Sequence, residues 1–231
     1  MKDMLRTLVS KAKADYLEIR IEETQVSSLR FQGPTLEAVN ANKRYGGCVR
    51  ALVQGGWGFV TFNDLDNLHA RIDLAIHQAR LVGAAGGDAV LAPVPVVEDV
   101  VEVPFKEDPR SIPLASKIDL FQGYNEIILA HGKPVISSSI NYFDQYSKIH
   151  FANSEGTYIL QHKLDLAGNI TAIATDGATT QMGRTGFGSS MDFGVARNLD
   201  GKIKEACTKA VNLVAAPSVR GGEYTVIVDP D

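Results

Sequence analysis

The stretch that decides the fold class is residues 47–62, GCVRALVQGGWGFVTF, in which apolar side chains recur at alternate positions on both sides of Gly55-Gly56. Alternation with a period of two is typical of a half-buried β-strand, and a glycine pair between two such runs predicts a turn. A connection this short joins antiparallel strands, because a parallel crossover needs a dozen residues or more. The stretch therefore predicts an antiparallel strand pair.

Upstream of this pair, three further runs have strand character: YLEIRIEE (16–23), VSSLRFQG (26–33) and TLEAVNAN (35–42). Candidate turn residues separate the runs: Thr24-Gln25, Gly33-Pro34 and Gly46-Gly47. Residues 16–62 are therefore predicted to form a meander of five short antiparallel strands.

Helices are predicted on either side of this meander. Residues 2–14 carry apolar side chains at helical spacing, and a second apolar stripe runs from Leu65 to Leu81, with Asn63 or Asp64 as its N-cap. A helix before and a helix after an antiparallel sheet predict an α+β domain with helices packed on one face of the sheet.

Residues 88–112 are rich in proline and predict an extended connection between two domains, 1–108 and 109–231. The second domain is expected to be an incomplete, mixed α/β domain with long antiparallel strands. Its expected elements are helices at 114–131 and 194–216 and strands at 135–144, 147–153, 157–174 and 223–228. A tight turn at 154–156 is expected to join two of these strands.

Composition excludes several classes of protein. With 45% hydrophobic and 22% charged residues, the 231-residue chain is typical of a globular protein rather than a disordered or coiled-coil one. A net charge of −4 without a basic stripe disfavours a nucleic-acid-binding function. The charged N-terminus, two isolated cysteines and the lack of a long apolar run predict a cytoplasmic chain without a membrane span.

The residues that usually carry chemistry form no recognisable motif. The five histidines show no H-E-x-x-H spacing, and Cys48 and Cys207 are interpreted as small buried apolar residues. The sequence therefore predicts no catalytic residue and no metal ligand in this chain. The glycine-rich stretch 183–190 is predicted to be a flexible loop or an exposed strand edge, and such an edge can receive an extended peptide.

The chain resembles the N-terminal portion of the TldD/PmbA family, zinc metallopeptidases once called modulators of DNA gyrase. Four segments carry the resemblance: ADYLEIRIEE, YGGCVRALVQGGWGFVTFND, FANSEGTYILQ and GGEYTVIVDPD. The last segment resembles the TldD type, in which this strand leads into a helix that carries H-E-x-x-x-H. The chain ends at Asp231, short of that helix. No residue here is therefore matched to a zinc ligand or to the catalytic glutamate.

The resemblance implies a parent enzyme that uses zinc to cleave unfolded or extended peptides, and an inactive, zinc-free front half in this chain. It also implies assembly with a TldE/PmbA-like subunit or self-association. Five residues are candidates for peptide contact: Gly183, Arg184, Gly186, Phe187 and Gly188. The alternative is a stand-alone protein- or peptide-binding module without catalysis. Because 223–228 has the pattern of a strand buried on both faces, we expect an exposed apolar patch in the second domain.

Overall fold

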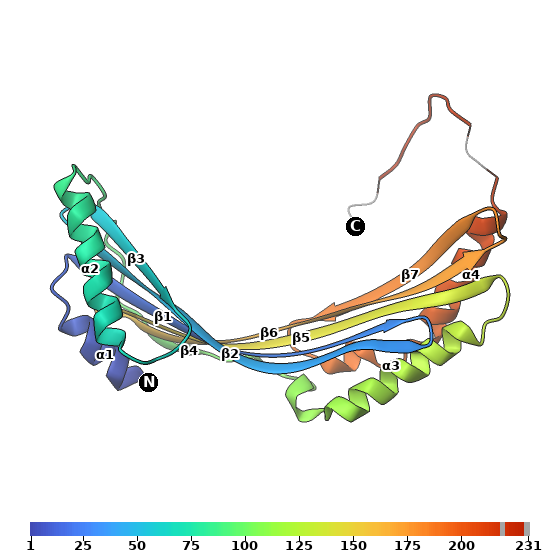
Figure 1. Ribbon diagram of the computed structural model, residues 1–231, viewed down its shortest axis with the longest axis horizontal. Helices are drawn as coiled ribbons and strands as arrows, with labels where there is room; N and C mark the ends of the chain where they lie inside the picture. The colour runs from blue at the N-terminus through green and yellow to red at the C-terminus, as the bar shows by residue number, and fades with distance from the viewer. Residues whose placement is uncertain (218–219, 229–231) are drawn as a thin grey trace.

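The computed structural model describes residues 1–217 and 220–228, which form an arched sheet with helices at both ends (Figure 1). The strands are β1 (Tyr16–Gln32), β2 (Thr35–Val53), β3 (Gly56–Phe62), β4 (Glu98–Val101), β5 (Val135–Asn153), β6 (Tyr158–Thr175) and β7 (Thr180–Ser189). The helices are α1 (Lys2–Ser10), α2 (Leu68–Ala84), α3 (Leu114–Leu129) and α4 (Asp200–Ala215), with the 3-10 helices η1 (Pro109–Ser111) and η2 (Phe193–Ala196).

One seven-stranded sheet runs through the described part of the chain, in the order β3-β2-β1-β5-β6-β4, with β7 also paired to β6. The short β4 lies parallel to β6, and every other neighbouring pair is antiparallel. The α+β fold predicted from the sequence is therefore confirmed. The same long strands β1, β5 and β6 serve both ends of the sheet, and the proposed division into domains near residue 108 remains a prediction.

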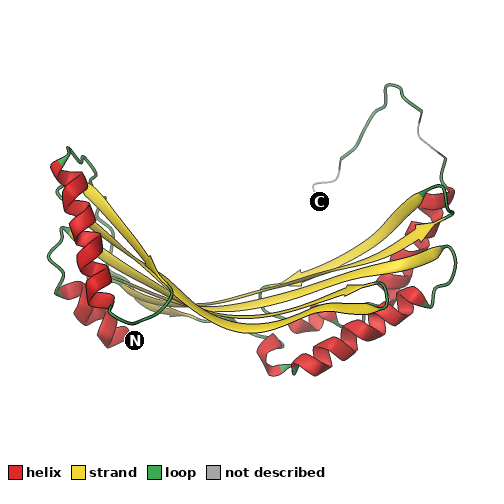
Figure 2. Ribbon diagram, viewed as in Figure 1, coloured by secondary structure: helices red, strands yellow, loops and turns green. Residues whose placement is uncertain are grey.

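The helices lie on one face of the sheet. Along β1, the odd-numbered residues are buried at both ends, first Leu17, Ile19 and Ile21 and then Leu29 and Phe31. Because side chains alternate between the two faces of a strand, these residues all point to the same side. Figure 2 shows α1, α2, α3 and α4 on the outer side of the arch, and within the described residues no helix packs on the inner face of the sheet.

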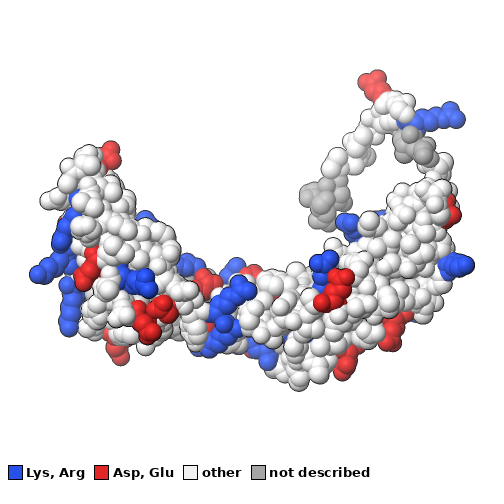
Figure 3. Space-filling model, viewed as in Figure 1, with Lys and Arg blue, Asp and Glu red and all other residues white. Residues whose placement is uncertain are grey.

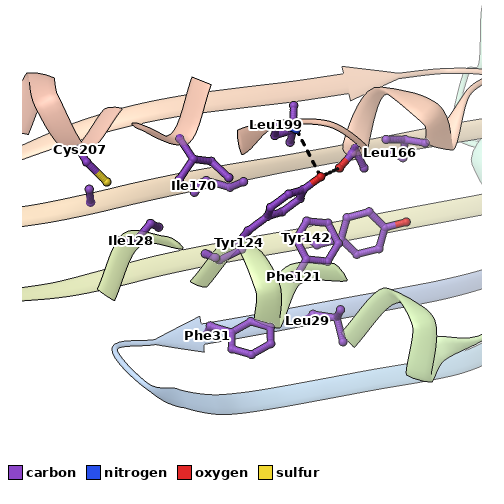
Figure 4. Close-up of a cluster of buried hydrophobic side chains, with 14 of the residues drawn as sticks. Leu29, Phe31, Phe121, Tyr124, Ile128, Tyr142, Leu166, Ile170, Leu199 and Cys207 are labelled. Carbon is purple, nitrogen blue, oxygen red and sulfur yellow. Dashed lines mark hydrogen bonds between the residues drawn. The ribbon is translucent and has the colours of Figure 1, made fainter. Parts of the chain in front are cut away.

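Two hydrophobic clusters hold the helices to the sheet. The N-terminal cluster joins α1 and α2 to β1, β2 and β3, and the C-terminal cluster joins α3 and α4 to β5 and β6. In the C-terminal cluster, the rings of Phe121 and Tyr142 lie 4.8 Å apart (Figure 4). The Tyr124 hydroxyl donates to the Ala196 carbonyl at 2.9 Å and accepts from the Leu199 amide at 3.4 Å. These bonds satisfy a phenol inside an apolar core.

The prediction of five short strands in residues 16–62 is wrong, because the structure has three strands there and two of them are long. Thr24-Gln25 lies inside β1, and Gly46-Gly47 lies inside β2. A Cβ atom on Gly47 would lie 2.4 Å from the Phe62 ring and 2.5 Å from the Arg20 carbonyl. This glycine therefore allows close packing within the sheet and does not form a turn.

Two expectations for the second half are also wrong. The strands predicted at 135–144 and 147–153 are one strand, β5, because its polar centre is paired on both sides by β1 and β6. The strand predicted at 223–228 is not formed, since these residues pair with no described strand. A strand is stable only when a neighbour satisfies its backbone groups. The Asp229-Pro230 turn lies outside the described residues.

Candidate functional site

None of the helices in the described residues covers the inner face of the arch. This face presents the even-numbered residues of β1 and the odd-numbered residues of β5 and β6, since the opposite set points into the two clusters. In Figure 3 charged side chains are dense around the N-terminal half and the centre of the molecule and sparser over the C-terminal half. In the C-terminal half, the inner-face residues of β1 and β7 include the charged Arg30 and Arg184.

The five residues predicted to contact a peptide all lie on β7, on alternating faces. Gly183 is buried against α4, where a Cβ atom would lie 1.8 Å from the Ala206 carbonyl oxygen. The Phe187 ring also points to the helix side, stacked at 6.1 Å on Phe121. Arg184, Gly186 and Gly188 are exposed on the opposite, uncovered side. A ligand on the inner face would therefore meet these three residues, whereas the other two hold α3 and α4 in place.

The edge strands of the sheet differ in the hydrogen bonds that their unpaired backbone amides make. On β3, the Phe59 amide donates to Gln78 Oε1 of α2 at 3.2 Å. On β4, the Val100 amide donates to the neighbouring Asp99 Oδ1 at 2.8 Å. Such side-chain caps block the pairing of another strand. The glycine-rich β7 is a strand and not a flexible loop: β6 pairs with one of its edges, α4 packs on its face, and no other strand of the described residues pairs with it.

No described residues form a group that fits a metal ion. Groups of three or more His, Cys, Asp or Glu with metal-binding geometry are absent from residues 1–217 and 220–228. The two histidines that lie within the sheet are each engaged by a tyrosine: His150 Nδ1 lies 2.9 Å from the Tyr158 hydroxyl, and His162 contacts Tyr146. Burial lowers the pKa of His150. These residues do not fit the metal that a metallopeptidase would require.

The two cysteines lie apart and neither has the setting of a reactive thiol. Cys207 is buried in the C-terminal cluster, and Cys48 is half-buried on β2. Burial is the main cause that raises the pKa of both thiols. A raised pKa keeps a thiol protonated and lowers its nucleophilicity. The prediction of a small buried residue is therefore confirmed for Cys207 and wrong for Cys48, which is only half-buried.

A buried charged cluster is a feature that the sequence did not reveal. Lys117 Nζ of α3 lies 2.6 Å from Asp144 Oδ2 of β5 and 2.8 Å from Ser27 Oγ of β1. The Tyr142 hydroxyl also donates to Asp144, at 2.6 Å. The cluster lines a pocket of about 500 Å³ near the centre of the arch. The local sequence offers only a lysine on a predicted helix, and its partners Asp144 and Ser27 lie 27 and 90 residues away.

Comparison with known proteins agrees with this architecture. The family model of PmbA/TldA metallopeptidase domain 1 matches residues 17–81, and the model of the PmbA/TldA metallopeptidase central domain matches residues 107–214. The arched sheet and these two matches define a metallopeptidase-related chain. The chain belongs to the PmbA/TldD family.

Individual relatives support the same assignment. A metalloprotease of Synechocystis sp. is 34% identical over 221 residues, which cover 95% of this chain and 47% of the relative. A Thermotoga maritima protein described as a modulator of DNA gyrase has the same fold, with a TM-score of 0.76 at 18% identity over 96% of this chain and 49% of that one. TldE from Thermococcus kodakarensis gives a TM-score of 0.67 at 13% identity, over 93% of this chain and 47% of that chain.

Two further facts bear on function. The chain spans about half the length of the curated relatives it matches. No helix in the described part of the chain combines the length and apolar character needed to cross a membrane.

Proposed function

We propose that this chain is the N-terminal, non-catalytic part of a TldD-like zinc metallopeptidase that cleaves unfolded or extended peptides in the cytoplasm. The observation that carries the proposal is the match of the first and central family domains to a chain that covers 47% of a metalloprotease. In this proposal, another part of the parent protein supplies the catalytic centre.

Within such an enzyme, the inner face of the arch would guide an extended peptide. Arg184, Gly186 and Gly188 support this role by their position, because they are exposed on the uncovered side of β7. The two glycines leave room for a second backbone to approach the strand. A TldE-like subunit or a second copy of the chain would complete the assembly.

The second candidate function is a stand-alone binding module without catalysis. It is favoured by the exposed edge of β7 and the uncovered sheet face, both of which can bind a peptide without a metal. The two functions differ in the sequence encoded after Asp231. A continued reading frame that encodes H-E-x-x-x-H supports the peptidase, whereas a stop codon there overturns it and favours the module.

The decisive biochemical experiment compares this chain with the extended protein. We expect the extended protein to bind one zinc ion per chain by elemental analysis and to cleave an unstructured peptide only when zinc is present. We expect the 231-residue chain to bind less than stoichiometric zinc and to cleave nothing. An extended protein that lacks zinc, or that cleaves equally well after chelation, would refute the proposal.

A further inference from the structure

A groove on the inner face, in the C-terminal half of the arch, joins side chains from four neighbouring strands. Its volume is about 590 Å³. Its lining includes the inner-face residues Ser28 and Arg30 of β1, Asn40 of β2, Asn141 and Phe143 of β5, and Asn169 of β6. The groove crosses the strands and is separate from the buried Lys117 cluster on the opposite face.

Strand register brings these residues together in two adjacent rows. In one row, Arg30 lies opposite Asn141, which lies opposite Asn169. In the other row, Asn40 lies opposite Ser28, which lies opposite Phe143. Directly opposed residues have Cβ atoms about 5 Å apart, so each row forms a continuous line of side chains.

Small residues in the two rows leave space above the sheet, so the groove is deeper there. Ala38 continues the first row on β2, and Ala167 continues the second row on β6. The two rows then reach Gly186 and Gly188 of β7, which pair with Asn169 and Ala167. A ligand that lies in the groove can therefore approach the sheet closely and extend toward the exposed side of β7.

The hydrogen-bonding groups of the groove are neutral amides. Asn141 and Asn169 are exposed, and each side-chain amide offers both a donor and an acceptor. Of the described residues that line the groove, Arg30 alone is charged, and its Nε lies 3.3 Å from Glu37 Oε2. The one charged side chain that lines the groove is thus paired, and uncharged peptide groups match the paired donors and acceptors of the amides.

We propose that this groove binds an uncharged, extended segment of polypeptide that runs across the strands. Asn141 and Asn169 hydrogen-bond its peptide groups, and Phe143, which is 38% exposed, packs against one of its apolar side chains. Four strands about 4.8 Å apart span about 14 Å, which accommodates about four residues of extended chain at about 3.3 Å each. This inference rests on the proposed function, because it assumes that the ligand is a peptide.

The test measures binding of a fluorescent, uncharged, unstructured decapeptide to the 231-residue chain by fluorescence anisotropy, without metal. We expect Asn141→Leu combined with Asn169→Leu to weaken binding at least about tenfold, the loss of one or two hydrogen bonds. The matched control is Asn212→Leu, an exposed asparagine of α4 on the helix side, which should leave the affinity unchanged. Retained unfolding midpoints show that the variants are folded.

A second measurement locates the peptide. With p-benzoylphenylalanine in place of Phe143, irradiation should cross-link the peptide to the chain, and the same group in place of Asn212 should not. Affinity should change little between about 0.05 and about 0.5 M salt, because the peptide carries no charge.

Four outcomes would overturn the groove as the binding site: no peptide binding by the wild type, equal affinity in the double variant, cross-linking at 212 but not at 143, or a strong loss of affinity with salt. Binding of a neutral oligosaccharide in place of the peptide would also overturn it. None of these outcomes affects the zinc and cleavage tests of the extended protein. Conversely, a stop codon after Asp231 would refute the peptidase and leave the groove standing.

Discussion

Lys117 and Asp144 show how one buried pair can stabilise the junction between helix and sheet. Their side chains are only 4% and 6% exposed, so each charge has lost most of its hydration. Ser27, Tyr142 and Lys117 all contact the same carboxylate oxygen. A buried pair contributes to stability only while its hydrogen bonds are complete, since the desolvation of the two charges must be offset.

Replacing Lys117 with Met should therefore lower the free energy of unfolding by about 3–5 kcal/mol, because it leaves the Asp144 carboxylate buried without a cation. The double variant Lys117→Met/Asp144→Leu should recover most of this loss. As a control, Lys163→Met removes an exposed partner of Asp165 and should cost less than about 1 kcal/mol. Urea denaturation measures all three. Equal losses for Lys117→Met and Lys163→Met would refute the argument.

We expect the substitution of glycine by alanine to have opposite effects on stability at Gly183 and Gly123. A Cβ atom at Gly183 would meet the backbone of α4 at Ala206, so Gly183→Ala should destabilise the protein by about 1–3 kcal/mol. At Gly123, inside α3, nothing beyond the two chain neighbours and the nearby backbone of the helix itself lies within 4 Å of the added Cβ. Gly123→Ala should therefore stabilise the protein by about 0.5–1 kcal/mol through its helix propensity. Thermal unfolding that shifts in the same direction for both variants would contradict this account.

At the scale of elements, a short connection fixes η2 against the segment that precedes η1. The Phe193 amide donates to the Glu107 carbonyl at 2.9 Å, and the Arg197 guanidinium donates two hydrogen bonds to the Glu107 carboxylate at 3.0 and 2.6 Å. These contacts position Phe193, which is fully buried in the C-terminal cluster. The ion pair therefore acts as a link between two irregular segments.

This link predicts a dependence of stability on pH. The hydrogen bond from Arg197 lowers the pKa of Glu107 below its usual 4.5. A carboxylate with a lowered folded-state pKa stabilises the fold above its unfolded pKa and loses that effect as the pH falls through the folded value. Glu107→Gln should therefore cost at most about 1 kcal/mol at neutral pH, since both side chains are partly exposed. The difference from wild type should shrink below pH 4.5 in urea titrations; a difference that grows there would be contrary to the prediction.

At the scale of the whole molecule, the arch has one covered and one open face, and an apolar segment comes after α4. Val226, Ile227 and Val228 are 72%, 95% and 82% exposed. A continuous run of exposed β-branched residues is typical of a surface that another element covers. Residues 220–228 lie on the inner side of the arch, away from the strands (Figure 1).

The 231-residue chain should therefore bind the dye ANS and self-associate. Val226→Ser combined with Ile227→Ser should reduce both effects without changing the unfolding midpoint, because these side chains make few contacts in the fold. Dye fluorescence and size-exclusion chromatography measure the two effects. Weak dye binding together with a monodisperse monomer in the wild type would show that the apolar surface is not exposed in solution.

The sequence by itself determined the elements whose signals are local. Helical spacing placed α2 and α3, and the turns at Gly33-Pro34, Gly55-Gly56 and 154–156 lie where glycine permits a positive φ. The α+β class followed from the short connections between strands. Family membership followed from the order of four segments along the chain.

Only the tertiary structure decided which of these segments join. The sequence pattern predicts turns at Thr24-Gln25 and Gly46-Gly47, because polar residues and glycines usually mark turns. In the structure these sites lie inside β1 and β2. Neighbouring strands hold both sites in the sheet, and the Phe62 ring occupies the space beside Gly47. The alignment of Asn141 with Asn169 and the pairing of Lys117 with Asp144 likewise depend on register and helix docking. The periodicity of apolar residues indicates on which face of a strand or helix a side chain lies. Contacts between segments that are distant in sequence form only when the sheet is assembled.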